Sequence, residues 1–207
     1  MNGTCTAADA VYAYNLNGNC YLNLTNRCSL RCRFCPKFNG QWDVRGYGLR
    51  LHGEPDVDTL MSEVENQPEA CDEVVFCGLG EPTLRLGTVL ETGRRLRERG
   101  YRVRLNTDGL SNYVYGRDLL PRLAESVDAI SVSLNAQTAA VYAVNCRPKT
   151  PDAYAAVLDF LYRAPDVVPD VTATAVAGLP GVDMDACAEI ADKIGVGFRR
   201  RELGHVG

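Results

Sequence analysis

The chain has 207 residues, of which 46% are hydrophobic, and this is enough apolar material for one good-sized core. Its formal net charge of −4 argues against a general nucleic-acid binder or a membrane-surface binder. No stretch reaches the roughly 18 apolar residues of a membrane span, and the first residues lack the pattern of a secretion signal. We therefore expect a single domain over residues 1–207 in the cytoplasm, where the nine cysteines stay reduced.

Short apolar runs alternate along the chain with longer helical patterns. Asp56 or Asp58 is the expected N-cap of the first helix, Thr150 is that of the fourth, and Gly195 is expected to end the fifth. About six strand–helix units in series are typical of a parallel sheet or a barrel. The expected strands are residues 20–26, 73–78, 101–109, 128–135, 170–181 and 196–203, and the expected helices are residues 60–67, 89–100, 117–126, 150–164 and 183–195.

Residues 38–55 do not fit this repeat. The segment contains four glycines together with Trp42, Tyr47 and His52, which predicts a long irregular loop or a small hairpin beside the cysteines that precede it. Long loops in compact domains tend to be functional. Anchoring the loop is nevertheless the simpler role for Trp42 and Tyr47.

Three cysteines, Cys28, Cys32 and Cys35, stand close together in the stretch "TNRCSLRCRFCPK", directly after the first expected strand. A structural zinc site normally has four protein ligands, and only Cys20 or His52 is available as a fourth. Three thiolates would instead hold three corners of a [4Fe–4S] cluster and leave the fourth iron open to an outside amine and carboxylate. The other cysteines have no ligand spacing and are expected to be small apolar side chains: Cys5, Cys20, Cys71, Cys77, Cys146 and Cys187.

Unusual residues follow five successive expected strands. The cysteine loop over residues 28–35 follows the first, and "GLGEP", "NTDG", "SLNA" and "AGLPG" follow the next four. Sites in parallel sheets and barrels form at the carboxyl ends of the strands. The sequence therefore predicts one shared site, although "NTDG" by itself is equally explained as a turn.

The spacing Cys28-x3-Cys32-x2-Cys35, with Phe34 before the last cysteine, resembles the radical SAM signature. The run Gly-Leu-Gly-Glu-Pro at residues 78–82 resembles the Gly-Gly-Glu-Pro motif of that superfamily, with its second glycine displaced. With "LNTDGLSNYVYGRD" and "ISVSLNA", these motifs are similar to the small radical SAM proteins associated with TatD-type nucleases.

The resemblance implies a partial (βα)6 TIM-like barrel, one [4Fe–4S] cluster and S-adenosylmethionine (SAM). Reductive cleavage of SAM would give a 5′-deoxyadenosyl radical that abstracts hydrogen from the substrate. The three cysteines would bind the cluster. The remaining positions implied to contact SAM are Gly78 and Gly80 for close backbone approach, Glu81 for the methionine ammonium, Ser133 and Asn135 for the ribose and carboxylate, Asn106 and Thr107 nearby, and Val176 and Leu179 at the adenine.

The expected partners are SAM, an external one-electron donor of flavodoxin or ferredoxin type, and an unidentified substrate. The chain is short, which leaves little to close the mouth of the barrel and favours a macromolecular substrate or a partner that completes the lid. A functional link to a TatD-like nuclease is implied by the resemblance alone. The alternatives are a non-catalytic iron–sulfur binding or electron-transfer module and a zinc-binding structural module.

Three consecutive arginines, Arg199, Arg200 and Arg201, lie on the last expected strand. Strand side chains alternate between the two faces of a sheet, so the three cannot all point inward. We expect Arg199 and Arg201 to face the mouth and Arg200 to point away. An inward arginine, with Tyr47 and His52, is predicted to recognise an anionic or polar group on SAM or on the substrate.

Overall fold

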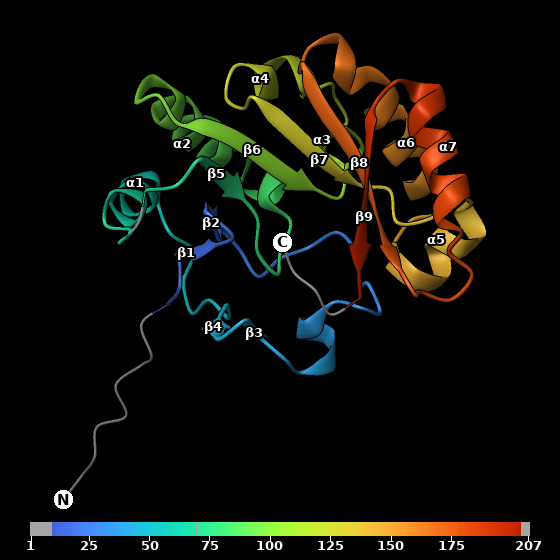
Figure 1. The fold of residues 1–207 in the computed structure, drawn as a ribbon, viewed down its shortest axis with the longest axis horizontal. Helices are drawn as coiled ribbons and strands as arrows, with labels where there is room; N and C mark the ends of the chain where they lie inside the picture. The colour runs from blue at the N-terminus through green and yellow to red at the C-terminus, as the bar shows by residue number, and fades with distance from the viewer. Residues whose placement is uncertain (1–9, 69, 204–207) are drawn as a thin grey trace, which may run out of the picture.

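The computed structural model of the protein describes residues 10–68 and 70–203 (Figure 1). Cys5 therefore lies outside the described residues. No helix in the described part of the chain combines the length and the apolar character needed to cross a membrane.

One seven-stranded sheet, in the order β1-β2-β5-β6-β7-β8-β9, organises the molecule. The first strand runs antiparallel to β2, and the other neighbours in the sheet are parallel. The first and last strands of this order are the sheet's edges, so the barrel is partial, and the expected (βα)6 architecture is confirmed. The strands are β1 (Ala13–Leu16), β2 (Asn19–Leu22), β5 (Glu73–Phe76), β6 (Arg102–Thr107), β7 (Ala129–Ser133), β8 (Asp170–Ala177) and β9 (Gly197–Glu202).

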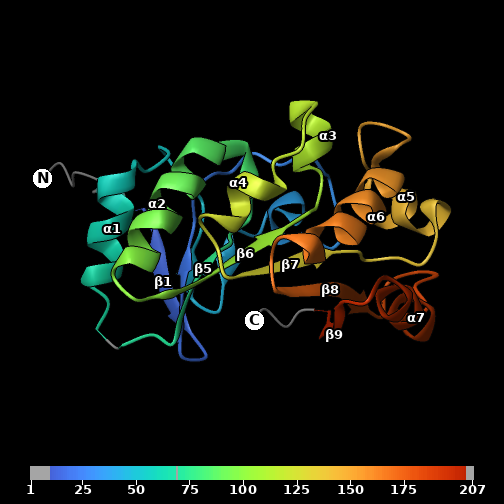
Figure 2. The same cartoon turned by 90° about the horizontal axis from the view of Figure 1, so that it is seen from above.

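Helices cover the outer face of the sheet; Figure 2 shows α1, α2, α4 and α6 together on that side. The Asp56 carboxylate accepts a hydrogen bond from the Thr59 N–H at 2.8 Å, so Asp56 caps the first helix. Gly195, in the left-handed conformation, ends the last helix as predicted. The α-helices are α1 (Val57–Glu65), α2 (Leu86–Glu98), α3 (Ser111–Tyr115), α4 (Leu120–Ala124), α5 (Ala139–Cys146), α6 (Ala153–Arg163) and α7 (Met184–Ile194), and the 3-10 helices are η1 (Pro36–Asn39), η2 (Pro82–Arg85) and η3 (Ala164–Asp166).

Several local predictions differ from the structure. The expected cap Thr150 is wrong, because α6 begins at Ala153 after two turn residues and has no side-chain cap. Strand β1 and helices α3 and α5 were not predicted from the sequence. Helix α5 is capped by Thr138, whose hydroxyl accepts from the Val141 N–H at 3.3 Å. The irregular segment contains the small hairpin of β3 (Asp43–Val44) and β4 (Tyr47–Gly48), one of its two expected forms.

The two faces of the sheet differ in chemistry. Apolar side chains point outward into a buried core beneath the helices, as Val103, Leu105 and Val132 do. The alternate positions on four neighbouring strands point into the barrel and are polar. These inward positions, which line the cavities of the barrel, are Arg104, Asn106, Ser131, Ser133, Thr172, Thr174, Arg199 and Arg201. A polar barrel interior is suited to a polar ligand.

Candidate functional site

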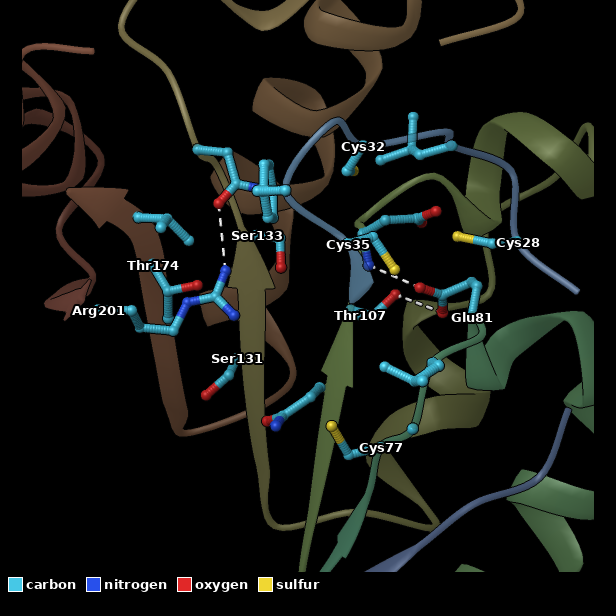
Figure 3. Close-up of a pocket in the computed structure, with 18 of the residues that line it drawn as sticks. Cys28, Cys32, Cys35, Cys77, Glu81, Thr107, Ser131, Ser133, Thr174 and Arg201 are labelled. Carbon is cyan, nitrogen blue, oxygen red and sulfur yellow. Dashed lines mark hydrogen bonds between the residues drawn. The ribbon is translucent and has the colours of Figure 1, made fainter. Parts of the chain in front are cut away.

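A cavity of about 270 Å³ lies at the carboxyl ends of the parallel strands (Figure 3). The ends of all six parallel strands or the loops that follow them contribute to its wall, as the sequence predicted. Eleven of the twelve residues predicted to bind the cluster or SAM line it: Cys28, Cys32, Cys35, Gly78, Gly80, Glu81, Asn106, Thr107, Ser133, Asn135 and Val176. Leu179 is buried elsewhere and does not line it, so its predicted contact with the adenine has no support.

The cysteine loop is held in place by the end of α5. The Arg31 N–H donates to the Cys146 carbonyl at 3.1 Å, and the Arg33 N–H donates to the Asn145 carbonyl at 2.9 Å. Leu30, Cys32 and Phe34 line the cavity, whereas the alternate residues Arg31 and Arg33 do not line it and are exposed. The missed helix α5 is therefore the support for the cysteine loop.

The three thiols are partly buried, and this burial favours their neutral form. Burial, then the carboxyl groups of Asp108 and Glu81, raise the pKa of Cys28 to about 12. A hydrogen bond with the Cys146 thiol, together with burial, raises the pKa of Cys32, and burial raises the pKa of Cys35. Because a metal binds the thiolate, loading this site must release protons.

The spacing of these thiols bears on the kind of metal site. Zinc–sulfur bonds of about 2.3 Å place the sulfurs of a tetrahedral site about 3.8 Å apart. In the described residues, no three His, Cys, Asp or Glu side chains are grouped closely enough to hold one metal ion. An iron–sulfur cluster spreads its ligands, because each thiolate binds a different iron atom. Three thiols on one loop are compatible with such a cluster.

Glu81 connects the tips of two strands through its side chain. Its Oε1 accepts from the Thr83 N–H at 3.0 Å, from the Thr83 hydroxyl at 2.8 Å and from the Thr107 hydroxyl at 2.8 Å. Its Oε2 accepts from the Asp108 N–H at 2.7 Å. Burial and the nearby Asp108 carboxyl raise the pKa of Glu81 to about 8. Oε1 therefore accepts three hydrogen bonds within the protein and Oε2 accepts one, so acceptor capacity is left mainly on Oε2.

Gly78 and Gly80 are needed for close contact between two segments of the chain. A Cβ atom on Gly78 would lie 2.4 Å from Oδ1 of Asn23, and one on Gly80 would lie 2.0 Å from the Thr25 carbonyl oxygen. The Glu81 N–H donates to the Arg27 carbonyl at 2.8 Å beside this contact. The glycines thus seat the "GLGEP" loop against the start of the cysteine loop, a reason that differs from the predicted approach to SAM.

Asp108 connects this arrangement to the cysteine loop. One of its carboxylate oxygens accepts from the Ser29 hydroxyl, and the other accepts from the Leu110 N–H at 2.9 Å. The sequence analysis treated this residue only as part of a turn. Glu81, Asp108 and Ser29 together link the segments that follow β5, β6 and β2.

The opposite wall contains Asn135 and two of the three arginines. Asn135 has a φ of 59°, the left-handed region that Asn tolerates, and its Oδ1 accepts from Nη2 of Arg201 at 3.1 Å (Figure 3). Arg199 and Arg201 line the cavity, while the exposed Arg200 pairs with Glu202 at 2.7 Å. The predicted orientation of the three arginines is confirmed.

Two predicted contacts are wrong, and two cysteines were assigned too simply. Tyr47 donates its hydroxyl to the Asn15 carbonyl at 3.1 Å and His52 is exposed, and neither lines the cavity. Cys77 lines the cavity, and Cys146 lies against the Cys32 thiol, although both were expected to be plain core residues. Contacts between segments that are distant in sequence determine the positions of Cys77 and Cys146. The spacing of cysteines along the chain could not have indicated these positions.

The cavity also contains buried polar atoms that lack partners. Among the described residues, Oδ1 of Asn106 and the Nε atoms of Arg199 and Arg201 make no hydrogen bond. All three residues line the cavity beside the three thiols. Buried groups of this kind are rare in proteins unless a ligand or water satisfies them. The residues present therefore fit a metal cluster together with a polar molecule that carries both donors and acceptors.

A family model described as the Radical SAM superfamily matches residues 22–194, which is most of the chain. The chain belongs to the radical SAM superfamily. The match includes the cysteine loop, the "GLGEP" loop and every strand of the parallel sheet except β9 and the first residues of β2.

Individual proteins are similar to this chain in sequence or in fold. The tungsten-containing aldehyde ferredoxin oxidoreductase cofactor-modifying protein of Pyrococcus furiosus is 29% identical over 119 residues, which is 56% of this chain and 30% of that protein. The structure of TYW1 with a lysine–pyruvate adduct bound has a TM-score of 0.62 at 14% identity and covers 91% of this chain and 66% of that one. Streptococcus suis SuiB bound to S-adenosylmethionine has a TM-score of 0.61 at 15% identity, over 88% of this radical SAM chain and 38% of its own.

The structural matches and the sequence match support different conclusions. The structural matches share the fold with this chain at low sequence identity. The chain spans less than a third of the Pyrococcus furiosus relative, so that protein's role does not transfer as a whole.

Proposed function

We propose that this chain is a radical SAM enzyme that binds one [4Fe–4S] cluster through Cys28, Cys32 and Cys35 and uses SAM as the molecule it cleaves. The observation that carries the proposal is that the loop with the three thiols shares one cavity with polar side chains whose buried atoms have no hydrogen-bond partner among the described residues. Three thiolates leave one iron free for SAM. When bound, the cluster supplies the electron that splits SAM into methionine and a 5′-deoxyadenosyl radical.

The protein's own groups would bind and orient SAM. Asn135 and Arg201, which contact each other, would receive the SAM carboxylate as a charge-assisted hydrogen-bond pair. Ser133 and Asn106 offer a hydroxyl and an unpaired carbonyl oxygen to the ribose. Val176 supplies an apolar contact for the adenine. Glu81 acts mainly as a positioning residue, because it fixes the two loops between which SAM would lie.

The experiment that tests cluster ligation compares cysteine variants after anaerobic reconstitution. Cys28→Ala, Cys32→Ala and Cys35→Ala should each lose the broad iron–sulfur absorbance, with iron and sulfide falling to background. Cys187→Ala, at a buried cysteine of α7 outside the cavity, is the matched control and should retain about four iron atoms per chain. An intact cluster in the Cys32→Ala protein would show that Cys32 is not a cluster ligand. Zinc in place of iron and sulfide would favour the alternative of a zinc-binding structural module.

The electron donor is proposed to dock on the outer side of the cysteine loop. Arg31 and Lys37 both lie over the exposed Phe38 ring, with their charged groups 5.4 Å and 4.9 Å from its centre. Arg33 and Arg147 flank the same contact between the loop and α5. In the part of the chain that the structure describes, these four cations form no pair with a carboxylate. A basic surface next to the cluster suits an acidic donor protein of flavodoxin or ferredoxin type.

The substrate is proposed to reach the cavity from the mouth of the open barrel. The two edge strands of the sheet, β1 and β9, leave one side of the barrel without a covering strand. This opening supports a large substrate or a partner that covers it. The alternative function, an electron-transfer module without catalysis, shares the cluster but predicts no cleavage of SAM.

A further inference from the structure

Two arginines inside the barrel lack the partners that buried cations normally have. Arg199 and Arg201 stand two residues apart on the inner face of β9, and neither pairs with a carboxylate among the described residues. Arg201 donates to Asn135 at 3.1 Å, and Arg199 donates to the Ser131 hydroxyl at 3.5 Å. The Nε atom of each is buried without a hydrogen-bond partner. Neither arginine therefore has a carboxylate in direct contact within the described part of the chain, although the Glu73 charge acts on Arg199 from a distance.

The carboxylates around these arginines are used elsewhere. Glu73 pairs with Arg104 at 2.7 Å and also with Arg102 at 3.1 Å. Across the cavity, Glu81 and Asp108 accept hydrogen bonds from the loops that they connect. At the strand's end, Glu202 pairs with the outward Arg200. None of these carboxylates is paired with Arg199 or Arg201.

Leaving such a cation unpaired costs stability. Burial, together with the neighbouring Arg104 charge, lowers the pKa of Arg199. A lowered pKa means that the fold disfavours the charged form of this side chain. A buried charge without a partner destabilises a protein, whereas an apolar residue of similar size at the same position does not. A function for the charge would explain why it stands there.

The two arginines lie at different depths in the barrel. Arg201 lies near the carboxyl end of β9, and Asn135, its partner, in turn contacts the Cys146 thiol beside the cysteine loop. Arg199 lies one layer deeper, about 6.6 Å away along the strand. Together with Ser131 it lines both the upper cavity and a second cavity at the opposite end of the barrel, whose wall includes Arg104 and Thr172. Arg199 is thus separated from the cysteine loop by the Arg201 layer.

SAM has a single carboxylate, and the proposed function assigns it to the layer of Arg201 and Asn135. The deeper cation then remains without an anion when SAM is bound. We propose that Arg199, with the Ser131 hydroxyl, is a binding site for an anionic group of the substrate, a carboxylate or a phosphate, inside the barrel. This inference rests on the proposed function. Arg199 is then a substrate-binding residue, and the substrate is a molecule that carries an anionic group.

The test measures thermal unfolding of the cluster-reconstituted protein saturated with SAM, in a buffer of low anion content. Inorganic phosphate and succinate are the two probes, and they distinguish a phosphate site from a carboxylate site. The variants are Arg199→Met, which keeps an unbranched and flexible side chain without the charge, and Arg199→Lys, which keeps the charge. Arg200→Met, at the exposed neighbour, is the matched control.

The parent and Arg200→Met should be stabilised by at least one probe. Arg199→Met should have a higher Tm than the parent without the probe, because an unpaired buried charge has been removed, and should bind that probe at least five-fold more weakly. Arg199→Lys should retain part of the response. The proposal is overturned if Arg199→Met has the parent's response to both probes, or if the parent responds to neither. A lower Tm of Arg199→Met without the probe would also overturn it, because that result assigns Arg199 a structural role.

A separate measurement, of SAM cleavage, tests the proposed function. SAM cleavage by dithionite-reduced parent protein is measured without any probe and without any change at Arg199. A parent that binds phosphate through Arg199 but cleaves no SAM refutes the proposed function. A parent that cleaves SAM while Arg199→Met keeps its full anion response refutes only the inference about the substrate.

Discussion

Adding one methyl group at Gly80 should force apart the two loops that form the site. The new Cβ atom would lie 2.0 Å from the Thr25 carbonyl oxygen and 2.7 Å from the Arg27 carbonyl oxygen. Because an ordinary carbon–oxygen contact is about 3.3 Å, the loops must separate by about 1.3 Å. Both oxygens are backbone atoms, so no side-chain rotation can relieve the contact. The hydrogen bond from the Glu81 N–H to the Arg27 carbonyl, now 2.8 Å, lies next to it and would be stretched.

The expected cost follows from these two effects. Overpacking a filled site costs about 1–3 kcal/mol, and losing a hydrogen bond costs about 0.5–1.5 kcal/mol. The free energy of unfolding of Gly80→Ala should therefore fall by about 2–4 kcal/mol, measured by anaerobic urea unfolding of the cluster-free protein. Gly87→Ala is the matched control, because a Cβ atom in that helical position meets no atom within 4 Å, and a gain of up to about 1 kcal/mol is expected. Equal stability of Gly80→Ala and the parent would show that the close contact of the two loops does not require glycine.

The other predictions concern Glu81 and the electron donor. Glu81→Ala should lower the free energy of unfolding by about 2–4 kcal/mol, since two buried N–H groups lose their acceptor, whereas the exposed Glu202→Ala should not; equal effects in urea unfolding would contradict this. The Glu81 pKa, raised from 4.5 to about 8, means that the folded protein binds more protons than the unfolded chain, so this group's contribution to stability falls as pH rises between those values. Glu81→Gln should flatten that part of the stability–pH curve, and parallel curves would disprove the shift. Arg33→Glu should slow reduction by a flavodoxin about three- to ten-fold at low salt without changing dithionite-driven cleavage, while Arg122→Glu, an exposed cation on α4, should leave both rates unchanged.

The parts of the site that could be predicted from the sequence are those whose residues lie close together in short motifs. The three cysteines lie within eight residues, and one loop holds them all at the cavity. Alternation along a strand was enough to separate the inward Arg199 and Arg201 from the outward Arg200. The carboxyl ends of parallel strands converge, which is why motifs far apart in sequence were expected at one site.

The parts that the sequence did not predict depend on contacts between distant segments. Cys146 reaches the Cys32 thiol because α5 ends beneath the cysteine loop, and this helix was missed. Asp108 accepts from Ser29 across 79 positions of the chain, which no local pattern records. The roles of Glu81 and the two glycines were assigned to the ligand, although most of their contacts lie within the protein. Motif residues can thus be correct in position while their physical role is different.

The central claim is that this cavity binds SAM at a three-thiolate cluster and cleaves it reductively. The most direct measurement incubates the anaerobically reconstituted protein with SAM and dithionite and quantifies 5′-deoxyadenosine and methionine by chromatography. We expect equal amounts of both products, in excess of one turnover, and none from the Cys32→Ala protein treated in the same way. A protein that carries a complete cluster and binds SAM, yet releases no 5′-deoxyadenosine above the Cys32→Ala background, would contradict it.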